Sequence, residues 1–238
     1  MKSFFKMFLD SAKNFKDLRA ITTASMLLAM AIAIRTLSIE ITPDLRVGFT
    51  FVPIAAIAML YGPVICGVSS FLLDFLGYII TNKSARFYSP QLALVVILSG
   101  ILYGVLLYKC DFQKAKIKSC ILIVSACVAV CVICNILLNT YFLYTLYVNK
   151  DFSMFNSDDL KGFGVYMQPR AIKNLIEIPI RSVVLIMILP VVKLAYQRVS
   201  AQFSKRRVKT GHYRTVKAIP YILRGSFFCL TFILILEI

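Results

Sequence analysis

Ionisable side chains interrupt several long apolar stretches of this sequence, where they could hold a charged small molecule. Arg35 and Asp74 lie in two such stretches, and Lys173, Glu177 and Arg181 lie in a third. Ionisable residues inside membrane segments are costly and normally face an internal site or a partner. Guanidinium groups hold carboxylates through paired hydrogen bonds, so the pattern suits an anionic solute.

Each of these residues also has a simpler interpretation. A single arginine can extend to the membrane surface without binding anything. Glu177 and Arg181 are four residues apart, so on a helix they can pair with each other. Asp74 could be the counter-ion of Arg35 or Lys83, or it could accept hydrogen bonds from a solute. The case for a site comes from the group, because its members converge on one leaflet.

Other chemistries find little support in the sequence. The one histidine, His212, lies in a basic stretch, and most of the seven cysteines lie in apolar ones, so a metal centre or a catalytic triad is not expected. Cys131 and Cys134 form a C-x-x-C, which leaves a membrane thiol oxidoreductase as an alternative. No charged residue adjoins this pair, which favours buried cysteines that act as small apolar side chains. No P-loop is present, so the chain alone is not expected to hydrolyse ATP.

The composition predicts an integral membrane protein. Of the 238 residues, 59% are hydrophobic and 16% are charged, and the mean hydropathy is +0.80. A soluble domain usually carries about 25% charged residues. The apolar stretches are continuous rather than alternating, so helices are expected rather than a barrel.

The fold class expected is an all-α, six-helix transmembrane bundle. Tyr61, Gly62 and Pro63 divide one apolar stretch into two spans. Residues 1–19 form an amphipathic segment before the domain at 20–198, and a basic linker with an apolar end follows at 199–238. Residues 218–238 form either a seventh spanning helix or a helix that lies in the membrane interface. The spans are expected at 20–41, 49–61, 63–80, 91–108, 118–147 and 171–197.

The basic residues predict the orientation. They gather before the first span, between the fourth and fifth spans and after the sixth, so these parts and the N-terminus are expected in the cytoplasm. The net charge of +16 is therefore a topology signal with anionic lipid as its counter-charge, and nucleic acid is not an expected partner. In the first span, Ala20, Ala24, Ala29 and Ala33 are spaced for close helix packing, either inside the bundle or against another protein.

Seven segments, in this order and spacing, resemble the substrate-binding (S) components of energy-coupling factor (ECF) transporters, and among them the folate-type members. The resemblance covers about 20–198. The segments are 29–39 (AMAIAIRTLSI), 45–53 (LRVGFTFVP), 61–63 (YGP), 73–77 (LDFLG), 98–104 (LSGILYG), 138–140 (LNT) and 169–180 (PRAIKNLIEIPI).

The resemblance implies a vitamin-binding subunit of the cell membrane that makes and breaks no bond and needs no cofactor or metal. Its partners would be a transmembrane coupling protein, met at Ala29 and Ala33, and two cytoplasmic ATPases. For a folate-like solute, arginines suit the carboxylates, Asp74 and Asn139 suit the ring edge, and tyrosines suit its face. The expected binding residues are Arg35, Asp74, Tyr78, Arg86, Tyr88, Asn139, Arg170 and Asn174.

Two further alternatives remain beside the thiol oxidoreductase. Residues 88–94 depart from the family pattern at the start of the fourth span, so another vitamin such as riboflavin stays open. A stand-alone secondary transporter would work without ATPase partners.

Overall fold

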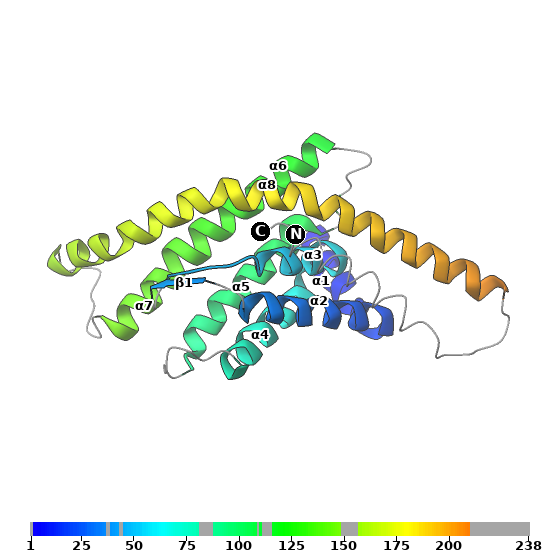
Figure 1. Ribbon diagram of the computed structural model, residues 1–238, viewed down its shortest axis with the longest axis horizontal. Coiled ribbons are helices and arrows are strands. Elements are labelled where there is room, and N and C mark those ends of the chain that lie inside the picture. Colours follow the sequence, from blue (N-terminus) through cyan, green and yellow to red (C-terminus); the bar gives the residue numbers. More distant parts are fainter. Residues whose placement is uncertain are drawn as a thin grey trace. The chain divides into compact units, whose positions relative to one another are not determined.

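The structure is a computed structural model, described for residues 2–36, 39–42, 45–80, 88–108, 110, 116–148 and 157–209. The chain divides into two units, Met1–Lys193 and Leu194–Ile238. Almost all described elements belong to the first unit (Figure 1). The elements are α1 (Lys2–Lys13), η1 (Asn14–Lys16), α2 (Leu18–Thr36), β1 (Ile39–Thr42), β2 (Leu45–Val47), α3 (Phe51–Tyr61), α4 (Pro63–Ile80), α5 (Pro90–Leu107), α6 (Lys116–Ala129), η2 (Val130–Asn139), α7 (Thr140–Tyr147) and α8 (Ser157–Lys209).

Helices account for nearly all described elements, as expected, but the count of six spans is not confirmed. Within the described part of the chain, five helices are long and apolar enough to cross a membrane: Leu18–Thr36, Pro63–Ile80, Pro90–Leu107, Ile117–Tyr147 and Lys161–Ser200. The sixth apolar helix, α3, has 11 residues. A helix needs about 20 residues to cross the hydrocarbon core of a bilayer. By its length, α3 is therefore not counted as a membrane span.

Two boundaries correct the sequence-based expectation. The first span was expected to reach residue 41, yet α2 ends at Thr36 and a short antiparallel hairpin follows, with Ile39 opposite Val47 and Glu40 opposite Arg46. The β-branched residues at 39, 41, 42 and 47 favour an extended backbone there, so the fold is not purely α. The second correction concerns 148–170, which was expected as a loop, whereas α8 begins at Ser157.

The break between α3 and α4 lies where the sequence predicts it. Gly62 adopts a φ of +86°, which is open to glycine and unfavourable for residues with a Cβ. Pro63 then begins α4, a position where its missing N–H costs no helical hydrogen bond. The chain thus reverses within one residue.

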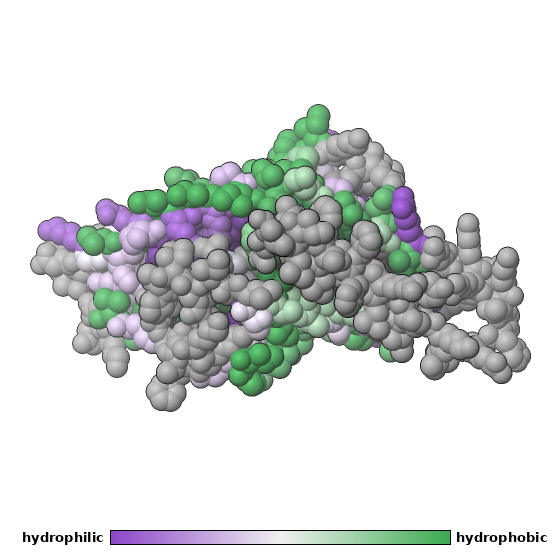
Figure 2. Space-filling view, in the orientation of Figure 1, coloured by the Kyte–Doolittle hydropathy of each residue, from purple (hydrophilic) through white to green (hydrophobic). Residues whose placement is uncertain are grey.

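Side-chain polarity on α8 is inverted relative to a soluble helix. Arg170, Asn174 and Glu177 are buried, whereas Leu175 is 71% and Met187 69% exposed. Hydrophobic side chains form much of the surface along α8 and α6 in Figure 2. Apolar residues therefore face the lipid, and polar residues face the neighbouring helices.

Glycines bring α4 and α5 into close contact. A Cβ built on Gly104 would overlap the backbone of Pro63, and one on Gly100 would overlap the Ser70 hydroxyl. Small residues of this kind allow helix backbones in membranes to approach each other.

We predict that Gly104→Ala destabilises the protein by about 1–3 kcal/mol or more, because the clash involves backbone that cannot rotate away. Gly164→Ala on α8 is the matched control, since a Cβ there has no neighbour within 4 Å. That control should be neutral or slightly stabilising, because alanine favours helix more than glycine does. Thermal unfolding in detergent measures both variants, and equal melting temperatures would contradict the packing described.

Candidate functional site

The first group of polar residues joins α2 to α4. Arg35 Nη1 donates a hydrogen bond of 3.1 Å to the Leu73 carbonyl and lies 3.4 Å from Asp74 Oδ1. The guanidinium lies flat against α4 at Gly77, where a Cβ would be only 2.6 Å from it. Glycine at 77 thus makes room for the arginine, and Asp74 is its counter-ion.

Aromatic rings lie beside this ion pair. The Tyr88 ring packs edge-on against Tyr78 and Phe75, with ring centroids 5.2 and 5.9 Å apart. The Tyr88 hydroxyl is buried, and the Asp74 carboxylate lies beside it as an acceptor. Burial, and then the negative charge of Asp74, raise the pKa of Tyr88. The hydroxyl is therefore neutral at physiological pH and keeps its proton.

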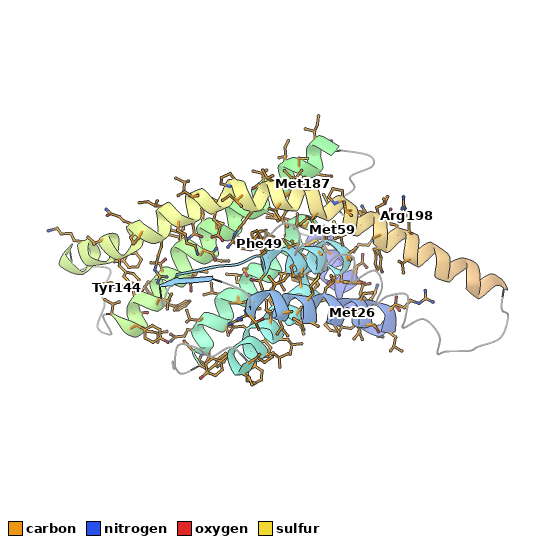
Figure 3. The ribbon with its side chains drawn as sticks, viewed as in Figure 1. Met26, Phe49, Met59, Tyr144, Met187 and Arg198 are labelled. Carbon is orange, nitrogen blue, oxygen red and sulfur yellow. The ribbon has the colours of Figure 1, made fainter. Side chains whose placement is uncertain are left out.

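The second group connects α8 with η2. Arg170 is 5% exposed, its guanidinium lies 4.8 Å from the Tyr166 ring centroid, and Nη2 donates to the Tyr166 hydroxyl at 3.0 Å. Asn174 donates to the Arg170 carbonyl at 2.8 Å and accepts a 3.3 Å bond from Asn135 of η2. The Tyr166 ring also packs on the ring of Tyr144 in α7, with centroids 5.4 Å apart; Figure 3 labels Tyr144. Three elements thus hold the arginine in one place.

One turn further along α8, Glu177 lies between two cations. Its Oε1 accepts a 2.8 Å hydrogen bond from Arg181, and its Oε2 is 3.8 Å from Lys173. Arg181 also stacks 5.1 Å from the Phe51 ring of α3. The pairing of Glu177 with Arg181 was expected from their spacing and is confirmed. From 170 to 181 the sequence carries three basic residues and one acidic residue, so this inward side of α8 has an excess of positive charge.

Helix η2 is a π-helix of ten residues, Val130–Asn139. π-Helices are rare in proteins, and those that do occur are often found at functional sites. It carries Asn135 toward α8 and contains Cys131 and Cys134, both free and 0% exposed. Reagents and redox partners in water cannot reach these thiols in this conformation, which weighs against the oxidoreductase alternative.

The structure brings together some of the predicted site residues. Arg35, Asp74, Tyr78 and Tyr88 lie in the first group, and Arg170 and Asn174 lie in the second. Asn139 is half-buried at the end of η2, and Arg86 lies outside the described residues. The small residues of α2 divide by face: Ala20 and Ala24 are buried, whereas Ala29 and Ala33 are exposed.

Sequence reasoning missed the aromatic partners of the two inward-facing arginines. Tyr166 precedes Arg170 by four residues, a spacing that could have predicted the contact on a helix. Phe51 is far from Arg181 in sequence, and no local signal connects them.

The comparisons with known proteins agree with this geometry. Residues 19–189 match the family described as "ECF transporter, substrate-specific component". The chain belongs to this family. Its relatives include "Folate transporter FolT" of Clostridium novyi (strain NT), 31% identical over 151 residues, which are 63% of this chain and 76% of the relative. "Folate transporter FolT" of Leuconostoc mesenteroides subsp. mesenteroides is 31% identical over 166 residues, 69% of this chain and 81% of that protein.

A solved structure is similar as well. "Crystal structure of FolT bound with folic acid" aligns with a TM-score of 0.56 and 25% identity, and covers 71% of this chain and 90% of that one. The chain is thus an S component of the membrane. These relatives are described as transporters, which gives the alternative of a membrane enzyme no support.

We predict that Arg181→Met destabilises this S component by about 3–5 kcal/mol, because it leaves the buried Glu177 carboxylate without its closest partner. The double variant Glu177→Gln/Arg181→Met should lose less, since it removes the charge and its partner together.

Thermal unfolding in detergent measures the series, with Arg198→Met as the control. Arg198 is exposed on the same helix, so its replacement should be nearly neutral. If the double variant is at least as unstable as Arg181→Met, the stabilising effect of Arg181 does not come from its ion pair with Glu177.

Proposed function

We propose that this S component binds folate or a related anionic vitamin and delivers it to an ATP-driven module. The observation that carries this proposal is the inward side of α8, where Arg170 is held against Tyr166 and Asn174 within a stretch of three basic residues and one acidic residue. The folate relatives and the folate-bound structural neighbour supply the choice of vitamin.

The two groups suit different parts of such a solute. A folate molecule has a flat ring system with donors and acceptors and a tail with two carboxylates. Arg170 and Arg35, with Arg86 from the segment before α5, would hold the carboxylates. Tyr78 and Tyr88 would stack on the ring, and Asp74, Asn139 and Asn174 would pair with its edge. Sites for small molecules typically have mostly apolar walls with a small number of well-placed polar groups.

Delivery would require partners that this chain lacks. We propose a transmembrane coupling protein and two cytoplasmic ATPases, with the N-terminus on the cytoplasmic side. The exposed Ala29 and Ala33 offer a flat strip of α2 on which another helix could pack closely. In this scheme the subunit binds and releases its solute and catalyses no reaction.

We predict that Arg170→Ala weakens folate binding by about 1.5–3 kcal/mol, roughly ten- to a hundredfold in Kd, because it removes a charge-assisted hydrogen bond. Because the chain contains no tryptophan, the quenching of its tyrosine emission or the fluorescence of folate itself reports binding to the purified protein.

Arg198→Ala is the matched control and should bind like the natural protein. Riboflavin, titrated in parallel, tests the other vitamin class, since its neutral ring depends less on arginine. Tight riboflavin binding without folate binding would reject folate, and an unchanged folate affinity would clear Arg170 of this role.

We predict that Ala29→Leu/Ala33→Leu abolishes co-purification with the coupling protein and ATPases while vitamin binding persists, because two large side chains would separate the helices. Ala195→Leu, exposed on α8, serves as the control. Loss of vitamin binding together with co-purification would instead indicate that the strip packs within this subunit.

A further inference from the structure

Helix α1 precedes the part of the chain that matches the family, which begins at residue 19. Its two sides have different environments. Ser11 is fully buried against the bundle, whereas Phe5 is 67% and Leu9 63% exposed on the other side. Beyond η1, Leu18 is 80% exposed as well. Large apolar side chains exposed along one side of a helix are typical of a surface that meets a membrane or another molecule.

A buried hydroxyl fixes α1 in place. Ser11 Oγ donates a 2.7 Å hydrogen bond to the Tyr61 carbonyl at the end of α3 and accepts one of 3.1 Å from the Val64 N–H at the start of α4. Asn14 Nδ2 donates to the same carbonyl at 3.3 Å. The serine therefore caps two helix ends at once, and α1 is held to the α3–α4 turn.

This attachment sets the depth of α1 relative to the membrane. The α3–α4 turn immediately precedes the candidate span Pro63–Ile80, and the candidate span Leu18–Thr36 begins five residues after the end of α1. A helix held between the ends of two spanning helices lies at the level of the lipid headgroups. At this level its exposed apolar strip is within reach of the acyl chains.

The charges beside the strip identify the occupant. Residues 1–19 contain five basic and two acidic residues, and Lys6, Lys13, Lys16 and Arg19 are exposed. A helix with apolar residues on one side and lysines beside them is typical of binding to an anionic membrane surface. We propose that α1 is a membrane-surface helix that inserts Phe5 and Leu9 into the adjacent leaflet and binds anionic lipid headgroups through Lys6 and Lys13.

A single tryptophan tests this proposal in the full-length protein, because the natural chain has none. Phe5→Trp is placed in nanodiscs of phosphatidylcholine alone or with phosphatidylglycerol, each with and without brominated acyl chains. At a depth of about 5–10 Å the tryptophan should lose about half its emission to bromine, and the loss should be larger with phosphatidylglycerol. Leu175→Trp, on the exposed apolar side of α8, is the positive control, with quenching independent of headgroup charge.

Adding Lys6→Gln and Lys13→Gln to the reporter should remove the phosphatidylglycerol dependence and leave the protein folded, since both side chains are exposed. Absence of bromine quenching at position 5 while position 175 is quenched would overturn the proposal and indicate that α1 faces water or another protein. Equal quenching in both lipids would overturn the role of anionic headgroups. Neither the bromine quenching nor its dependence on phosphatidylglycerol requires vitamin binding. If the proposal for α1 fails, the proposed function is therefore unaffected.

Discussion

The cost of placing charged groups away from water governs this structure. In an apolar slab an ionised side chain is tolerated only with a partner, and α8 shows the consequence. Arg170, Glu177 and Arg181 all turn inward, where Tyr166, Lys173 and Phe51 meet them. The apolar residues between them turn outward. The same requirement that keeps the helix stable in the membrane therefore gathers cationic groups in the interior.

Close packing of the remaining helices supports this arrangement. Arg35 can lie along α4 because Gly77 has no side chain, and α5 can approach α4 because Gly104 has none. The π-helix η2 contributes Asn135, which joins its own segment to α8 through Asn174. These contacts hold polar groups on rigid helices rather than on loops, which is the condition for a preorganised site.

The sequence predicts the parts of this fold that depend on composition and local spacing. Long apolar stretches predict the helices, Gly62 and Pro63 predict the reversal between α3 and α4, and the four-residue spacing predicts the pairing of Glu177 with Arg181. It does not predict η2, because no residue pattern separates a π-helix from an α-helix in an apolar stretch. The contact of Arg181 with Phe51 is a tertiary one that local rules cannot supply. The early start of α8 was missed because 157–170 is rich in polar residues and glycine, which are unusual in a membrane-spanning helix.

The two arginine pairs differ in a way that separates a structural role from a binding role. Arg181 lies 2.8 Å from Glu177, the distance of a strong charge-assisted hydrogen bond, and its side chain is 14% exposed. Arg35 lies 3.4 Å from Asp74 and its side chain is 22% exposed. A solute carboxylate that replaced Glu177 would leave a buried charge behind, at high cost, whereas one that approached Arg35 would compete with a longer and more accessible contact. On the proposed function, Arg35 therefore meets the vitamin, while the Glu177–Arg181 pair keeps α8 in position against α3.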